Sequence, residues 1–307
     1  MTREYNPVSL RIIFFGTPDF AVPTLEALAR AHDVALVVAQ PDKPAGRGLQ
    51  VQSPAVANKA RELGLRLAQP AKVRDVLAEV EAAGPEAGIV VAYGKILPAS
   101  LLKIPKRGFF NVHASILPKY RGAAPIQRAI ENGETETGIT IMRVDEELDH
   151  GPILSAVRTP IGPDERASQL STRLARMGSD AMLSTLAGID EVIETPQDHS
   201  RATLAPKIEK AEGEMCWTDA ASTIYNKFRA FDPWPGIFRN DLKLVEIAPA
   251  SGTGAPGTIL SIDADGVVVA TAGGAIKLLV VQRAGKSRQR ASDFARGAGW
   301  RLGARLE

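Results

Sequence analysis

The sequence contains very little cysteine or histidine. Cys216 is the only cysteine among 307 residues, and four histidines are present. A disulfide framework within the chain is therefore excluded, which fits the reducing cytoplasm. Cysteine and histidine are also too few and too scattered for a tetrahedral zinc site, so we expect no metal. Cys216 lies beside Trp217, where a new unit is expected to begin, and this position favours a structural thiol over a catalytic nucleophile.

Long apolar runs and a charge excess are also missing. No stretch approaches the roughly 18 apolar residues of a membrane-spanning helix, and residues 1–10 carry no apolar leader segment. We therefore expect a cytoplasmic protein with no membrane partner. The formal net charge of +2 gives no overall attraction for a polyanion, although a local basic patch remains compatible with it. A hydrophobic content of 45% over this length allows about two domains.

Two nucleotide-binding fingerprints are absent. The first apolar run, residues 11–15, leads into Gly16-Thr17-Pro18, which lacks the glycine spacing of a dinucleotide-binding turn. A phosphate-binding loop with its Gly-Lys-Ser/Thr ending does not occur either. These absences argue against hydride transfer and against nucleotide hydrolysis.

Short apolar runs alternate with helical patterns along the first two thirds of the chain. One helix is expected to follow Asp19 as its cap, with Pro23 in its first turn. Such alternation predicts an α/β domain with a Rossmann-like, mostly parallel sheet, over residues 1–194. The predicted strands are 11–15, 34–39, 89–92, 109–114, 139–144 and 153–159, and the further helices are 54–63 and 168–186.

The character of the sequence changes after this domain. Residues 195–213 are polar and charged, with two prolines, and are interpreted as a linker. A helix over 222–231 follows, and then short β runs separated by glycine and proline turns. That spacing predicts a small antiparallel β-barrel of the OB-like kind over residues 214–307. Its predicted strands are 242–248, 257–262, 267–271 and 276–282.

The strand over 109–114 carries two polar residues near its end. Asn111 and His113 are two positions apart, so their side chains share one face of the sheet. Ligands bind outside the C-terminal edge of such sheets, and an amide beside an imidazole suits oxyanion stabilisation in acyl transfer. A carboxylate is expected to hold the imidazole. The pattern alone leaves that choice open among Asp145, Glu146, Glu147 and Asp149.

A longer run around these residues resembles a known signature. Residues 113–126, His-Ala-Ser-Ile-Leu-Pro-Lys-Tyr-Arg-Gly-Ala-Ala-Pro-Ile, are similar to the signature of enzymes that formylate an amine with 10-formyltetrahydrofolate. Separate motifs in the order of the same family, most similar to its tRNA-directed members, lie at 14–23, 40–48, 91–98, 202–213 and 231–236. The resemblance covers nearly the whole chain. It implies transfer of a formyl group from 10-formyltetrahydrofolate to the α-amine of methionyl initiator tRNA.

The resemblance also implies roles for individual residues. The family's catalytic trio corresponds to Asn111, His113 and Asp149. The segment that lies along the folate corresponds to Ser115, Ile116, Leu117 and Pro118. The acidic loop departs from the family pattern, because Glu147 and His150 replace a usual glycine and threonine, and Pro152 replaces a common aspartate. These departures bear on the conformation of the loop more than on its chemistry.

Two basic elements are interpreted as tRNA contacts. The resemblance implies that Arg47, in the loop over 43–48, reaches the acceptor stem. Residues 49–52 lack the lysines that relatives often have there, which predicts a weaker electrostatic grip. A basic cluster beside a small barrel suits binding to a nucleic-acid backbone. Together with two lysines of the linker, the expected contacts are Lys207, Lys210, Lys286, Arg288 and Arg290.

Two alternatives remain open at this point. A formyltransferase acting on an amino sugar nucleotide or on a ribonucleotide amine would share the trio and the folate segment. A non-catalytic RNA-binding protein built on a decayed enzyme is the second alternative, and the intact trio argues against it. The arginine loop and the linker motif favour the tRNA substrate. We expect the protein to be a monomer.

Overall fold

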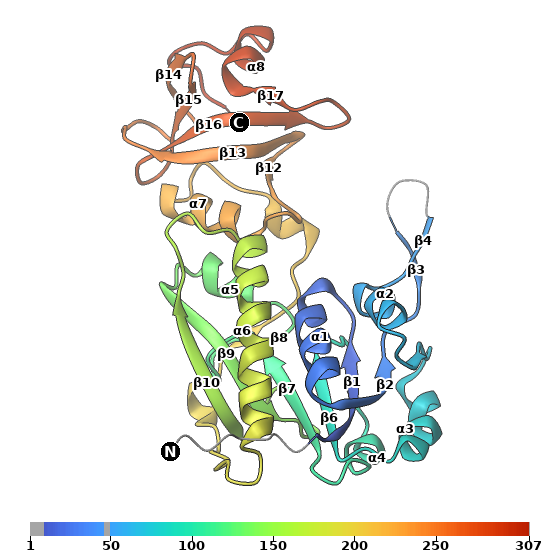
Figure 1. Ribbon diagram of the computed structural model, residues 1–307. Coiled ribbons are helices and arrows are strands. Elements are labelled where there is room, and N and C mark those ends of the chain that lie inside the picture. The colour runs from blue at the N-terminus through green and yellow to red at the C-terminus, as the bar shows by residue number, and fades with distance from the viewer. Residues whose placement is uncertain (1–8, 46–49, 307) are drawn as a thin grey trace, which may run out of the picture. The chain divides into compact units, whose positions relative to one another are not determined.

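The structure is a computed structural model that describes residues 9–45 and 50–306 (Figure 1). The chain forms two compact units. The N-terminal unit consists of Met1–Pro125, Glu136–Pro160 and Ser171–Pro206, and the C-terminal unit consists of Ile126–Thr135, Ile161–Leu170 and Lys207–Glu307. The domain boundaries predicted at residues 194 and 213 stay predictions. In the described part of the chain, no helix has the length and apolar character to cross a membrane.

The N-terminal unit contains a seven-stranded sheet with strand order β10-β9-β7-β6-β1-β2-β5. Five neighbouring strands are parallel, which confirms the predicted mostly parallel α/β sheet: β1 (Arg11–Gly16), β2 (Asp33–Val38), β5 (Leu67–Ala68), β6 (Ala87–Val91) and β7 (Phe109–His113). At the other edge, β9 (Glu136–Arg143) pairs antiparallel with β7, and β10 (Ile153–Pro160) pairs antiparallel with β9.

The central strand β1 is buried on both faces. Its residues 12–15 are fully buried, as expected for an apolar run in a sheet covered on both sides. Ile13 and Phe15 share a cluster with Val76 of the 3-10 turn η2 (Val73–Val76) and with Val80 of α3 (Leu77–Ala83). Burying each such side chain stabilises the fold by about 1.5–3 kcal/mol. This packing fixes the central strand of the sheet in place.

Further helices of this unit are α1 (Val22–Ala31), α2 (Ala55–Glu62), α4 (Ala99–Leu102) and α6 (Ala167–Ala187), the last with its first turn in the C-terminal unit. Figure 1 shows α1 and α6 in front of the sheet. Gly178 allows the close approach of α6, because a Cβ there would lie 2.6 Å from a methyl group of Val112. The predicted cap at Asp19 is wrong: Asp19 begins a 3-10 turn, η1 (Asp19–Ala21), and Ala21 precedes α1.

The C-terminal unit contains α5 (Pro125–Glu131), α7 (Ala221–Ala230) and an antiparallel sheet of order β12-β13-β16-β15-β14, with β17 on β16. The four predicted β runs correspond to β13 (Leu242–Ala250), β14 (Ile259–Asp263), β15 (Gly266–Ala270) and β16 (Ala275–Arg283). The antiparallel β unit is therefore confirmed, and its closure into a barrel stays a prediction. The α-helices and strands of this unit without a sequence prediction are α5, β12 (Ile237–Arg239), β17 (Gln289–Arg290) and α8 (Ala291–Gly297).

Candidate active site

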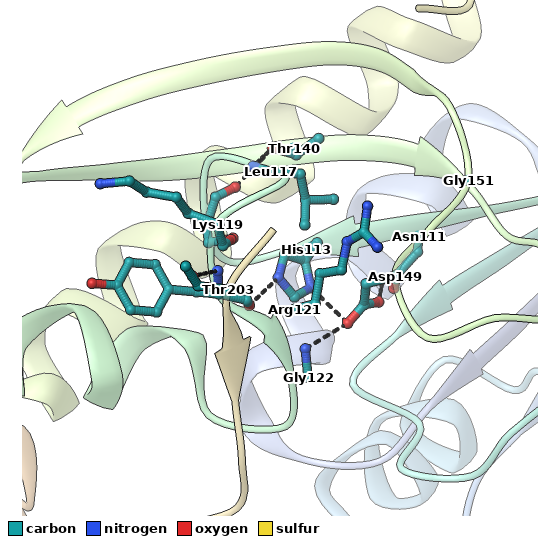
Figure 2. Close-up of polar contacts among 12 residues, drawn as sticks. Asn111, His113, Leu117, Lys119, Arg121, Gly122, Thr140, Asp149, Gly151 and Thr203 are labelled. Carbon is teal, nitrogen blue, oxygen red and sulfur yellow. Dashed lines mark hydrogen bonds and ion pairs between the residues drawn. The ribbon is translucent and has the colours of Figure 1, made fainter. Parts of the chain in front are cut away.

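Three predicted catalytic side chains meet at the C-terminal end of β7. Asn111 and His113 project from the same face of this strand, and Asp149 lies in the loop between β9 and β10. The amide Nδ2 of Asn111 donates to Oδ1 of Asp149 at 3.3 Å, and Nδ1 of His113 lies 3.5 Å from Oδ2. Figure 2 shows the three side chains turned toward one another. The face-sharing predicted for Asn111 and His113 is therefore confirmed.

The His113 ring has an acceptor oxygen at each nitrogen. On the side opposite Asp149, Nε2 lies 2.9 Å from the backbone carbonyl oxygen of Tyr120. A carbonyl only accepts hydrogen bonds, and a carboxylate also accepts, so a ring with hydrogen on both nitrogens satisfies both contacts. The side chain of His113 is 5% exposed, and that of Asp149 is 13% exposed. The pair therefore interacts in surroundings that screen charge less than bulk water does.

Asp149 is the only one of the four acidic candidates in contact with the imidazole of His113 among the described residues. Its Oδ2 also accepts the backbone N–H of Gly122 at 2.8 Å, and its own backbone has a φ of 47°, in the left-handed region. Asp145 instead contacts Nδ1 of His150 at 2.7 Å. The structure thereby resolves a choice that the acidic pattern left open.

The predicted folate segment begins two residues after His113 and is held to β9 by hydrogen bonds. Thr140 is fully buried; its hydroxyl donates to the carbonyl of Ser115 at 2.7 Å and accepts the N–H of Leu117 at 3.2 Å. The hydroxyl of Ser115 is itself used, because it donates to the carbonyl of Lys119 at 2.6 Å. Ser115 and Leu117 are buried, whereas Ile116 and Pro118 are half-buried. A role of this segment in folate binding stays a prediction.

Part of the segment interpreted as a linker forms a wall of the site. The short strand β11 (Leu204–Ala205) pairs parallel with β8 (Arg121–Gly122). Next to this pairing, the backbone N–H of Tyr120 donates to Oγ1 of Thr203 at 2.9 Å. The carbonyl that faces His113 is therefore fixed by residues about 80 positions later in the chain.

The three positions at which the acidic loop departs from the family pattern each make a defined contact. His150 stacks on His199, with ring centroids 4.1 Å apart and an interplanar angle of 3°. Glu147 is exposed, and its backbone N–H donates to Asp145 at 3.0 Å. Pro152 accepts the backbone N–H of Arg143 at 2.9 Å. The substituted positions thus shape the loop and leave Asp149 against His113.

Arg143, at the base of this loop, forms an ion pair with Glu194. Its Nε lies 2.9 and 3.0 Å from the two carboxylate oxygens, and Nη2 makes a further contact. This pairing holds the pKa of Glu194 below its usual range, against the opposing effect of partial burial. Nη1 of Arg143 also donates to the carbonyl of Arg107 at 2.6 Å. The end of β9 is therefore anchored just before the loop begins.

Sequence reasoning missed two buried polar residues near the trio. Arg121 is 8% exposed and Gln197 is 6% exposed. The guanidinium of Arg121 donates to Oε1 of Gln197, with Nη2 at 2.6 Å and Nε at 3.2 Å. Arg121 belongs to the signature at residues 113–126, and this membership could have identified it as a residue of the site. Gln197 stands in a polar segment whose composition predicts a linker, so no signal distinguished it.

The structure places the expected tRNA contacts as follows. Arg47 lies outside the described residues, and the two linker lysines, Lys207 and Lys210, are exposed. Lys286 and Arg288 are exposed between β16 and β17, and exposed Arg290 ends β17. Contact of these residues with tRNA stays a prediction. Within residues 9–45 and 50–306, no group of three or more His, Cys, Asp or Glu is arranged to hold a metal ion.

Solved structures share the fold of this chain. An N-formyltransferase from Helicobacter canadensis, in complex with folinic acid and dTDP-3-aminofucose, matches with a TM-score of 0.68 and 18% identity over 88% of this chain and 98% of its own. HypX from Aquifex aeolicus, in complex with tetrahydrofolic acid, matches with a TM-score of 0.64 and 19% identity over 94% of this chain. This chain spans about half of the HypX chain, 47%. At these identities the likeness concerns the fold alone.

Sequence relatives carry the assignment further. The formyl transferase family matches residues 10–186, and its C-terminal domain family matches residues 207–299. Methionyl-tRNA formyltransferase from Thermus thermophilus is 45% identical over 97% of this chain and 99% of its own length. The enzyme of that name from Deinococcus radiodurans is 43% identical over 97% of this chain and 96% of its own. The chain therefore belongs to the formyl transferase family and, within it, to the methionyl-tRNA formyltransferases.

Proposed function

We propose that Asn111, His113 and Asp149 carry the chain's formyl transfer from 10-formyltetrahydrofolate to the α-amine of methionyl initiator tRNA. The observation that carries the proposal is the convergence of the three side chains on one another, with Asp149 bridging the other two. The similarity to methionyl-tRNA formyltransferases over nearly the whole chain supports the acceptor.

In this mechanism the amine nitrogen of the methionyl group attacks the formyl carbon. A carbon–nitrogen bond forms, and the electron pair of the formyl carbonyl moves to its oxygen. Asn111 stabilises the developing oxyanion, because its amide has a second hydrogen besides the one donated to Asp149. The tetrahedral intermediate then collapses, and the bond from the formyl carbon to N10 of the folate breaks.

His113 and Asp149 manage charge and protons in this reaction. His113 stabilises the oxyanion through the positive charge of its ring, because both ring nitrogens face other acceptors, and Asp149 orients the ring through Nδ1. The proton that the attacking amine loses passes through water, assisted by Asp149, and N10 of the folate gains one. No covalent enzyme intermediate is needed, which agrees with an active site whose trio contains no hydroxyl or thiol nucleophile.

The loop after His113 supports binding of the formyl donor. Residues 115–118 combine buried polar and apolar groups and are fixed by Thr140, so they offer a preformed wall beside the trio. We propose that Ser115, Ile116, Leu117 and Pro118 lie along the folate. Proximity of donor and acceptor supplies much of the remaining acceleration.

The finer points of partner and location belong to the same proposal. The tRNA contacts are Arg47, Lys207, Lys210, Lys286, Arg288 and Arg290, and the enzyme acts as a cytoplasmic monomer. Sedimentation at working concentrations tests the monomer, since a dimer would double the measured mass.

Formyl transfer to different acceptors tests the function. We expect turnover with 10-formyltetrahydrofolate and methionyl initiator tRNA, and much slower turnover with a methionyl elongator tRNA. An amino sugar nucleotide and a ribonucleotide amine should give none. Preference for either small amine would identify a small-molecule formyltransferase. Binding of tRNA without formyl transfer would identify a non-catalytic RNA-binding protein.

A further inference from the structure

Gln197 uses both amide hydrogens on the loop that carries Asp149. Its Nε2 donates to the carbonyl of Asp149 at 2.9 Å and to the carbonyl of Gly151 at 2.7 Å. These two carbonyls flank His150, so one side chain holds the loop on both sides of that residue. Gln197 is 48 and 46 residues from Asp149 and Gly151 in the sequence, and all three residues belong to the N-terminal unit.

Arg121 fixes which way the Gln197 amide points. A guanidinium only donates, so its contacts at 2.6 and 3.2 Å require the amide oxygen of Gln197 to face it. The amide nitrogen is thereby directed at the two loop carbonyls. Nη2 of Arg121 also lies 2.8 Å from Nδ1 of His199, whose ring stacks on His150. Arg121 is thus linked to the Asp149 loop both through Gln197 and through His199.

The backbone conformation of Asp149 requires stabilising contacts of this kind. A residue with a side chain in the left-handed region costs roughly 1–2 kcal/mol, and Asp149 has a φ of 47°. Its carboxylate must nevertheless satisfy three groups from two other segments: Asn111, His113 and Gly122. A loop that relaxed by one ångström would lose these contacts, and misplacement on that scale can cost about 10²-fold in rate.

We infer that Gln197 is a positioning residue for formyl transfer, which holds the Asp149 carboxylate against His113 and Asn111 by binding the two carbonyls that flank His150. The inference rests on the proposed catalytic role of Asp149. Residues 195–213 are interpreted as a linker, and the inference assigns a role in catalysis to the beginning of that segment. Gln197 touches neither reacting group and acts through the loop alone.

Two substitutions separate the effects of Gln197. Gln197→Met removes both its donors and its acceptor. Gln197→Glu keeps an acceptor for Arg121 and loses the two donors to the loop, so it remains informative if Gln197→Met fails to fold. For both variants we expect kcat to fall about 10- to 100-fold, with each KM within about threefold of wild type.

Gln69 offers a matched control. Its Oε1 accepts from Arg61 at 2.9 Å, and its Nε2 donates to the carbonyl of Gln40 at 3.0 Å and to Asp42 at 2.6 Å. Gln69→Glu therefore also keeps an acceptor for an arginine and loses two donated bonds, at another loop. We expect Gln69→Glu to lower the thermal stability and to leave kcat unchanged. Wild-type kcat in both Gln197 variants, measured per folded enzyme, would overturn the inference.

A double-substitution cycle with Asp149→Asn separates the inference from the function on which it rests. If Gln197 acts through Asp149, its substitution has little further effect on kcat in the Asp149→Asn background. A fully additive loss would overturn the positioning role while leaving the catalytic assignment intact. Unchanged kcat in Asp149→Asn alone would overturn the catalytic assignment and the inference with it.

Discussion

The backbone N–H of Gly122 donates to Oδ2 of Asp149 at 2.8 Å, the same oxygen that faces Nδ1 of His113. The carboxylate is therefore aimed by the main chain of β8 as well as by side chains. A backbone donor is placed by the sheet pairing of its strand, here with β11, and does not depend on a side-chain rotamer. Catalytic geometry is in this way tied to a two-residue strand pair.

Substituting Gly122 should disturb this arrangement. Gly122 has a φ of 124°, and a Cβ there would lie 2.7 Å from the carbonyl oxygen of Ala205. Gly122→Ala should lower the free energy of unfolding by about 1–3 kcal/mol and reduce kcat, since β8 must shift against β11 and the N–H that Asp149 accepts shifts with it. Gly84→Ala is the control, because Gly84 has a φ of 58° with no atom within 4 Å of its Cβ position. It should cost about 1 kcal/mol without a change in kcat, measured by urea unfolding and steady-state kinetics.

Asn111 and His113 should each be needed for the chemical step. Asn111→Ala and His113→Ala should each lower kcat about 10²- to 10³-fold, because each removes a group that stabilises the oxyanion. Single-turnover rates with both substrates saturating measure this loss. Asn58→Ala serves as the control, since the exposed side chain of Asn58 contacts the carbonyl of Ser53 at 3.4 Å and accepts from Arg61 at 3.3 Å, away from the proposed catalytic residues. Near wild-type turnover in either active-site variant would contradict the assignment.

Most strands of the sheet could be predicted because each is a short apolar run that can be recognised from its own sequence. The apolar run at 11–15 has no alternation, which is how a strand buried on both faces appears, and β1 is buried from Ile12 onward. The strands β5 and β8 could not be predicted, since two residues carry no periodicity. Asp19 looked like a helix cap by type, but the chain makes a 3-10 turn before α1 begins.

The site was predictable only where its residues are close in sequence. Spacing alone paired Asn111 with His113, whereas the choice of Asp149 needed the family resemblance. Gly122 and Gln197 reach Asp149 through long-range folding that no local pattern encodes. Gln197 shows the difficulty most clearly, because a polar composition indicates a linker whether its amides face solvent or a buried loop.

Two arginines of the C-terminal unit should contribute to the grip on tRNA. Replacing Arg288 and Arg290 together by Ala should weaken binding and flatten the slope of log K against log salt by about two, because two phosphate contacts are lost. Fluorescence anisotropy with initiator tRNA across a salt series measures this. The pair Lys103→Ala and Lys106→Ala removes the same charge from exposed positions of the N-terminal unit and should leave the slope unchanged. An unaltered slope in the arginine variant would indicate a solvated turn.

Acid should weaken the anchor of the acidic loop. Arg143 lowers the pKa of Glu194 from its ordinary 4.5, so the folded state binds this proton less readily than the unfolded chain does. The pair therefore stabilises the fold above pH 4.5, and this contribution is lost as the pH falls through the folded-state pKa. Glu194→Gln should be less stable than wild type at pH 7, and the difference should shrink steadily below about pH 5. Urea unfolding at a series of pH values checks this, with Glu191→Gln controlling for net charge at a nearby exposed position. A stability difference that is the same at pH 7 and pH 3.5 would mean that the ionised pair does not anchor the loop.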